Sequence, residues 1–186
     1  LALKQTGAVN APHISICKSR IRDFIGEYKP DAFMSFISQG HGFDSPINLF
    51  ISEYLGADFF QHFHTQLGRT KSGDVVLQES QIPAFPDIIF AVMPKWDTAL
   101  SNEEKFLSRC YRNAINMAKS NGYKRIVLPA LGMGKSNFPH RRIVRLSLSA
   151  ITSELAAPIE EVVVVCAEDI MYTAYQERLT ALGLLK

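Results

Sequence analysis

Hydrophobic positions in this chain fall into short dense runs separated by longer stretches with helical spacing. Short runs rich in apolar and β-branched residues, bounded by turn residues, predict strands. Such runs occur at 13–17, 32–38, 74–79, 88–93, 125–128 and 161–167. The runs at 32–38 and 88–93 are apolar almost throughout, which is typical of strands buried on both faces of a sheet. We expect the strands at 74–79 and 88–93 to be neighbours.

The segments between these runs have the period of amphipathic helices. They cover 19–28, 45–55, 58–67, 101–120, 139–155 and the chain from 169 onward. Residue types that cap helices stand at their starts: Ser19, Asp44 or Ser45, Ser101 with Glu104, and Asp169. Strands that alternate with helices in this way predict an α/β fold, with a mostly parallel or mixed sheet between layers of helices.

Composition and length fit one globular domain. The chain has 186 residues, of which 47% are hydrophobic and 20% charged, enough to bury one core. Residues 1–12 carry no periodic pattern and predict a leader or linker before a single domain at 13–186. The net charge of +2 gives no sign of a general polyanion-binding surface. The three cysteines, Cys17, Cys110 and Cys166, lack the spacing of zinc ligands or of a disulfide framework and indicate reduced core residues.

No apolar run approaches the length of a membrane span, and no signal-peptide pattern opens the chain. We therefore expect a cytoplasmic location and no membrane contact by this domain. The chain opens on Leu1 rather than on methionine, which fits a piece cut from a longer protein. A fused effector domain in the parent chain is left open.

The first candidate for chemistry is the glycine-containing loop inside residues 126–139, IVLPALGMGKSNFP. It follows a buried strand and precedes a helix, the position at which open α/β sheets bind ligands. Gly132 and Gly134 would let backbone amides approach an anion, and Lys135 adds positive charge. The alternative is a tight turn with solvated basic residues.

The second candidate is the loop in residues 39–48, QGHGFDSPIN, again between a buried strand and a helix. Gly40 and Gly42 would let the backbone wrap a diphosphate from the other side. Asp44 either orients a water or a ribose hydroxyl beside the ligand or simply caps the next helix. His41 borders this loop, and its contact with a phosphate or a ligand head group is left open.

The order of segments and the strings at both loops resemble the macrodomain family of ADP-ribose binders. The matching strings are IVLPALGMGKSNFP, IIFAVMP at 88–94, Ser-Gly-Asp at 72–74, and the loop at 40–48. The resemblance implies a three-layer α/β/α fold in which helices flank a mixed, mostly parallel sheet of about six strands. It also implies that the diphosphate lies between the two loops.

The resemblance assigns roles to loop residues. Backbone amides around Gly42, Phe43 and Asp44 would meet one phosphate and those around Gly132 to Lys135 the other. Ser136 and Asn137 would border the distal ribose, and Asp44 falls on the aspartate that family hydrolases use to handle water. The expected ligand-binding residues are Gly40, His41, Gly42, Phe43, Asp44, Gly132, Met133, Gly134, Lys135, Ser136 and Asn137.

Two departures from the family pattern affect the choice of function. The paired asparagines after the second strand are absent, and the glycine-aspartate that reads adenine is replaced around residues 17–20, with Asp23 nearby. We therefore favour a module that binds or senses ADP-ribose or an NAD-derived relative, free or attached to a macromolecule. An ADP-ribosyl hydrolase or deacylase that uses Asp44 is the alternative, and a domain with a vestigial cleft is a third. Neither a cofactor nor a metal is expected.

Overall fold

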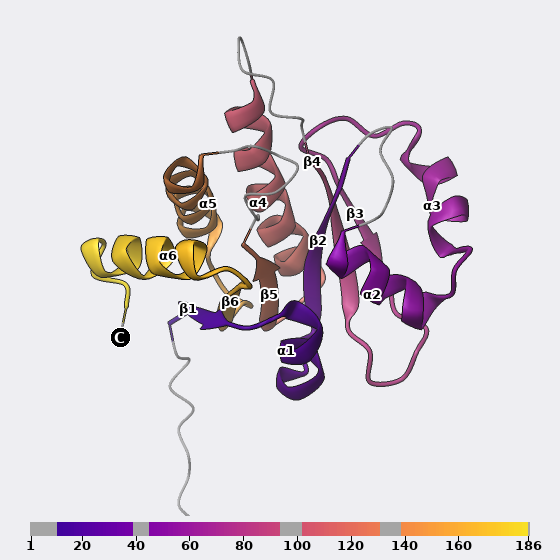
Figure 1. The fold of residues 1–186 in the computed structure, drawn as a ribbon, viewed down its shortest axis with the longest axis horizontal. Coiled ribbons are helices and arrows are strands. Elements are labelled where there is room, and N and C mark those ends of the chain that lie inside the picture. The colour runs from indigo at the N-terminus through magenta and orange to yellow at the C-terminus, as the bar shows by residue number, and fades with distance from the viewer. Residues whose placement is uncertain (1–10, 39–44, 94–101, 131–138, 186) are drawn as a thin grey trace, which may run out of the picture.

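The computed structural model describes residues 11–38, 45–93, 102–130 and 139–185 (Figure 1). Its elements in chain order are β1 (His13–Lys18), α1 (Ile21–Tyr28), β2 (Ala32–Ser38), α2 (Pro46–Leu55), α3 (Phe59–Leu67), β3 (Val75–Gln78), β4 (Asp87–Met93), α4 (Glu103–Ser120), β5 (Arg125–Pro129), α5 (His140–Glu154), β6 (Glu161–Cys166) and α6 (Asp169–Ala181). The strands form one sheet in the order β1-β6-β5-β2-β4-β3. Every neighbouring pair is parallel except β3 and β4. The expected α/β fold is confirmed, as is the pairing of the strands expected at 74–79 and 88–93.

Helices cover both faces of the sheet, because successive side chains of a strand point to opposite faces. In β4, Ile89 and Ala91 pack in one hydrophobic cluster, while Ile88, Phe90 and Val92 pack in the other. The first cluster contains buried residues of α4, α5 and α6, and the second contains those of α1, α2 and α3. The strands are therefore buried from both sides. This explains why their sequences are dense apolar runs rather than alternating ones.

Three expected helix caps are wrong. Asn102 rather than Ser101 holds the cap position of α4, with no side-chain cap hydrogen bond. The helix expected to begin at Ser19 begins at Ile21, with Arg20 at the cap position and no side-chain cap hydrogen bond. The Ser19 hydroxyl instead donates to the carbonyl of Arg20. At α6 the cap position belongs to Glu168, and Asp169 is the first helical residue. These helices are held by their packed faces, so a capping side chain is not required for them to form.

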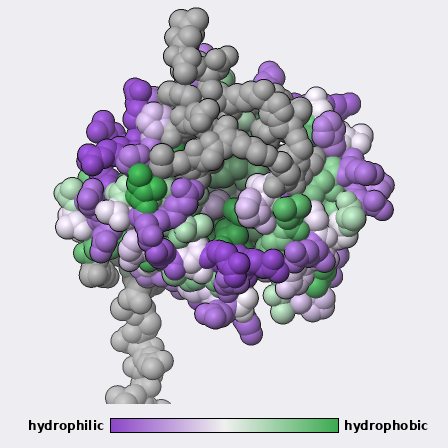
Figure 2. All heavy atoms as spheres, in the orientation of Figure 1, coloured by the Kyte–Doolittle hydropathy of each residue, from purple (hydrophilic) through white to green (hydrophobic). Residues whose placement is uncertain are grey.

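The cysteines are free thiols, with Cys110 and Cys166 buried and Cys17 partly buried. Burial raises the pKa of both Cys110 and Cys166 to about 12, so both thiols stay neutral at ordinary pH. Among the described residues no helix is long and apolar enough to cross a membrane. On the face shown in Figure 2 most described residues are hydrophilic, with apolar ones scattered among them.

Carboxylates close the amino end of the sheet, where the parallel strands begin. The Asp31 Oδ2 atom accepts hydrogen bonds from the backbone N–H groups of Lys124 (2.7 Å) and Arg125 (2.9 Å). This joins the start of β2 to the start of β5. At the start of β4, Asp87 accepts a hydrogen bond from the hydroxyl of Tyr123.

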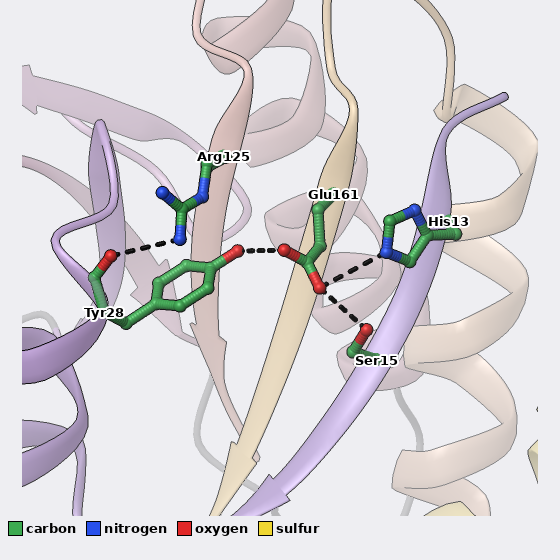
Figure 3. A network of polar contacts seen from close by, with 5 residues as sticks. All are labelled: His13, Ser15, Tyr28, Arg125 and Glu161. Atoms are coloured by element: carbon green, nitrogen blue, oxygen red, sulfur yellow. Dashed lines mark hydrogen bonds and ion pairs between the residues drawn. The ribbon is translucent and has the colours of Figure 1, made fainter. Parts of the chain in front are cut away.

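A larger network at the same end centres on Glu161, the first residue of β6 (Figure 3). Its carboxylate accepts hydrogen bonds from the hydroxyls of Tyr28 and Ser15, the latter at 2.9 Å, and lies 3.3 Å from His13 Nε2. The Arg125 guanidinium stacks over the Tyr28 ring, 3.9 Å from its centre, and donates to the Tyr28 carbonyl at 3.1 Å. The network thereby joins α1, β1, β5 and β6.

The protonation states in this network follow from the same contacts. Burial first, and then the hydrogen bond to Glu161, raises the pKa of Tyr28 to about 12, so the phenol remains a donor. Partial burial by itself raises the pKa of Glu161, but the hydrogen bonds from Tyr28 and Ser15 and the nearby His13 together bring it below the ordinary value of 4.5. A neutral phenol therefore donates to an ionised carboxylate, which makes a strong hydrogen bond.

Candidate functional site

The candidate site lies at the carboxyl end of the sheet, between β2 and β5. These strands are neighbours, but the chain leaves them in opposite directions. After β2 it forms α2 on one face and continues towards β3, and after β5 it forms α5 on the other face and continues to β6. Such a reversal is a topological switch point, where open α/β sheets hold their ligands.

The two strands also part at this end. Their register covers two pairs only, Ala32 with Ile126 and Phe33 with Val127. By contrast, β2 stays paired with β4 along its whole length, up to Ser38. Main-chain groups beyond Phe33 and Val127 therefore need partners other than the facing strand, since buried carbonyls are rarely left unpaired.

One of these partners is Asn48, a buried polar residue in the first turn of α2. Its Nδ2 atom donates to the carbonyl of Phe36 at 3.1 Å. Its Oδ1 atom accepts from the buried hydroxyl of Ser35 at 2.6 Å. Asn48 thereby fixes the start of α2 against the last part of β2, on either side of residues 39–44.

The cap of α2 is Ser45, whose hydroxyl accepts a hydrogen bond from the backbone N–H of Asn48 at 3.2 Å. Pro46 occupies the first helical position, where its missing N–H costs nothing. Of the two caps considered from the sequence, the structure therefore selects Ser45 rather than Asp44. The helix consequently does not need the Asp44 carboxylate to begin.

The other partner is Tyr111 of α4, which is fully buried against β2 and β5. Its hydroxyl donates to the carbonyl of Pro129 at 3.3 Å, and its ring contacts that of Phe36 edge to face at 5.7 Å. Burial raises the pKa of Tyr111 well above its ordinary value, so its hydroxyl stays a donor. On the far side of β5, Ala130 N–H donates to the carbonyl of Val165 at 2.9 Å. Both contacts hold the end of β5 immediately before residues 131–138.

A glycine turn supports the end of β4. Gly73 donates its N–H to the carbonyl of Val92 at 2.8 Å, and its own carbonyl accepts from Asn113 of α4, also at 2.8 Å. Its φ is +94°, and a Cβ there would lie 3.1 Å from the Cβ of Arg109. Only glycine meets both conditions, because a side chain would strain the backbone and crowd α4.

The helices that follow the two glycine-containing loops begin without acidic residues. The helices that begin after the two glycine-containing loops, α2 and α5, have no acidic residue in their first turns. Of the other helices, α1, α4 and α6 carry Asp or Glu there, whereas α3 does not. An anion would therefore meet helix N-termini whose partial positive charge is not already neutralised by a carboxylate.

All the sequence-predicted binding residues fall in two stretches outside the described residues, 39–44 and 131–138, and their roles stay predictions. The flanking residues are described. Arg142, in the first turn of α5, forms an ion pair with Glu104 of α4 at 2.8 Å. Asp23 is bonded to Arg20 at 2.7 Å on the surface of α1.

The sequence did not reveal the roles of Asn48 and Tyr111, which hold the last parts of β2 and β5. Asn48 left a usable signal, because it is a polar residue with helical spacing to the buried Ile51 in an otherwise apolar stretch. The sequence gives no signal for the role of Tyr111, because tyrosines are common on the buried faces of amphipathic helices. Within the described ranges, no group of three or more His, Cys, Asp or Glu residues is placed to hold a metal ion.

Comparison with known proteins agrees with this architecture. The Macro domain family profile matches residues 34–147. The chain is 34% identical over 118 residues to a Macro domain-containing protein in the gbd 3'region of Cupriavidus necator, covering 62% of this chain and 68% of that one. It is 27% identical over 156 residues to an O-acetyl-ADP-ribose deacetylase of Escherichia fergusonii, covering 82% and 87%.

Solved structures show the same fold. The Oceanobacillus iheyensis macrodomain with ADP superposes with a TM-score of 0.77 at 20% identity, covering 95% of each chain. The Trypanosoma brucei macrodomain in complex with ADP-ribose gives a TM-score of 0.71 at 17% identity, covering 90% of this chain and 69% of that one. With a family match over more than half of its length and a sheet that switches direction between β2 and β5, this chain belongs to the Macro domain family.

Proposed function

We propose that this chain binds ADP-ribose or an NAD-derived relative in the crevice where β2 and β5 part. The observation that carries the proposal is the early end of the β2–β5 ladder at Phe33 and Val127, at a point where α2 and α5 leave on opposite faces. The proposal places the diphosphate between residues 40–44 and 132–136. Backbone amides of these residues and the N-termini of α2 and α5 would provide the donors.

The names of similar proteins support this choice of ligand. One structural neighbour holds ADP and another ADP-ribose, and a relative that spans most of this chain is an O-acetyl-ADP-ribose deacetylase. A nucleotide diphosphate also suits helix N-termini without acidic residues, because two negatively charged phosphates would otherwise meet a carboxylate.

Calorimetry with ADP-ribose tests the proposal. Replacing Gly134 by Glu adds bulk and negative charge where we place a phosphate, and should weaken binding at least about a hundredfold, ~2.7 kcal/mol. The matched control is Gly26→Glu in α1, where an added Cβ meets nothing within 4 Å. Gly26→Glu should bind as the wild type does. Equal affinities for the wild type and Gly134→Glu would rule out this placement of the diphosphate.

A second candidate function is deacylation of an ADP-ribose ester, favoured by the deacetylase relative and by the helix cap at Ser45, which leaves Asp44 unneeded for that task. In this reaction a water oxygen attacks the acyl carbonyl carbon and the ester C–O bond breaks. The Asp44 carboxylate takes one water proton and passes it to the sugar oxygen that leaves, which releases the acid and the alcohol.

We expect tight binding with weak or no turnover, because the family's paired asparagines after the second strand are absent from this chain. Losing one positioning group commonly costs orders of magnitude in rate. The assay is release of acetate from O-acetyl-ADP-ribose by the wild type and by Asp44→Ala. Brisk release that disappears in Asp44→Ala, with ADP-ribose binding preserved, would make this protein an enzyme.

A further inference from the structure

Within the described residues, the outer edge of β1 is unpaired. There β1 lies at one side of the sheet and pairs only with β6. The N–H groups of His13 and Ser19 donate inward, to the carbonyls of Glu160 and Cys166. Because strand residues alternate, the N–H and C=O groups of Ile14 and Ile16 point outward. In the described part of the chain nothing accepts from or donates to them.

An apolar groove runs beside this edge on the α6 side. It has a volume of about 280 Å³ and is lined by β1, by Tyr172 and Gln176 of α6, and by Leu184 and Leu185 of the turn that follows. The turn reaches this position because Leu184 N–H donates back to the carbonyl of Leu179 at 2.9 Å. Figure 1 shows this C-terminal turn close to the start of β1.

Two residues that line the groove, Leu184 and Leu185, belong to a group of exposed apolar side chains on α6 and the turn after it. Six large hydrophobic residues are notably exposed in the described chain, and four of them, Ile170, Leu182, Leu184 and Leu185, lie on α6 or its following turn. Their exposed fractions range from 39% to 44%. A concentration of exposed apolar residues beside unpaired main-chain groups is the mark of a covered surface.

The charges at this surface favour a copy of the same chain over a charged partner. His13 is the only titratable group other than tyrosine that lines the groove, and it lies against Glu161. Lys18, at the end of the strand, pairs with Asp169. Two identical surfaces of this kind would meet without repulsion between like charges.

We propose that this chain forms a two-fold dimer in which the β1 strands of two copies pair antiparallel around Ser15. Ile14 of each copy then pairs with Ile16 of the other, and their outward N–H and C=O groups form the inter-strand hydrogen bonds. A two-fold axis perpendicular to the sheet keeps both α6 helices on the same face. The grooves and the exposed leucines then join into one apolar layer beneath a continuous sheet.

β3, the other edge strand, is a weaker candidate. It has four residues against six in β1. The hollow beside it is lined by polar side chains of Asp58, His62, Gln66 and Gln78 as well as by apolar ones. It therefore offers fewer main-chain bonds and less apolar area, and it serves as the internal control for β1.

Hydrogen exchange of single amides, followed against protein concentration together with sedimentation velocity, tests the pairing. Dimerisation should slow exchange at Ile14 and Ile16 as concentration rises. Exchange at Ser15 and Cys17, whose amides face β6, should be slow throughout, and exchange at Val75 and Leu77 on the β3 edge should not change with concentration.

Leu184→Glu combined with Leu185→Glu should weaken the dimer at least about tenfold, because charge enters the apolar layer. Leu49→Glu, at an exposed apolar residue of α2, is the matched control and should leave the association unchanged. If the double variant misfolds, the test uses Leu182→Glu instead, at another exposed leucine after α6. A chain that stays monomeric at every concentration, or a dimer in which Ile14 and Ile16 still exchange freely, would overturn the proposal. So would protection of these two amides in the monomer, because a segment of the same chain would then cover the edge.

Discussion

The two ends of the sheet use different side chains to bind the main-chain groups at the ends of their strands. At the amino end, strand starts are joined by carboxylates: Asp31 bridges β2 and β5, and Glu161 joins α1, β1 and β6. At the carboxyl end, β2 and β5 part, and neutral side chains bind the main-chain carbonyls that the facing strand leaves unpaired. The contacts at the amino end hold the fold together, and the carboxyl end is where we propose that the ligand binds. We therefore expect changes at the amino end to alter stability without altering ligand binding.

Asn48→Ala should be the most damaging change and should affect both properties. It leaves the buried Ser35 hydroxyl and Phe36 carbonyl without partners, and it frees the start of α2 from β2. We expect a loss of about 3 kcal/mol in the free energy of unfolding and weaker binding of ADP-ribose. Urea unfolding and calorimetry measure the two effects. Binding that is unchanged in a destabilised variant would show that α2 does not position the ligand loop.

Glu161→Ala should lower stability without affecting the binding site at the opposite end of the sheet. It removes the acceptor shared by the hydroxyls of Tyr28 and Ser15 and by His13. The expected cost is about 2 kcal/mol in the free energy of unfolding, with ADP-ribose affinity unchanged because the site lies at the opposite end. A drop in affinity similar to that of Asn48→Ala would disprove the separation.

Tyr28→Phe sharpens the test within the amino-end network. The ring can still stack beneath the Arg125 guanidinium, while the hydrogen bond to Glu161 is lost. We expect a destabilisation of about 1 kcal/mol, smaller than that of Glu161→Ala. A cost equal to that of Glu161→Ala would mean that the phenol bond carries the whole network. Thermal unfolding of the two variants side by side measures this.

The amino end should also make the stability of the fold depend on pH in the acid range. The pKa of Glu161 is lowered in the folded chain, so its ionised form stabilises the fold at pH values above the ordinary pKa of 4.5. That stabilisation is lost as the pH falls through the folded pKa. The stability difference between wild type and Glu161→Gln should therefore shrink below about pH 4.5. A difference that is constant from neutral to acid pH would show that ionisation of Glu161 is irrelevant to folding.

The sequence predicted most of the fold because local signals and the tertiary structure agree. Dense runs such as 88–93 mark strands buried on both faces, and each lies within a residue or two of the observed strand. The residues that cap the helices were harder to predict than the positions of the strands. Ser19 and Asp169 have the right chemistry next to the right helices, but packing places the helix starts at other residues.

The sequence by itself determined the class of fold, the number and order of its elements, and the two glycine-containing loops, because these follow from periodicity and from residues that act locally. It did not reveal that the β2–β5 ladder ends after two pairs, or that Asn48 and Tyr111 take over the carbonyls beyond it. It also did not reveal the Glu161 network, whose partner Tyr28 lies 133 positions away. These features join residues that are distant in the chain, so only the tertiary structure, which brings them together, could decide them.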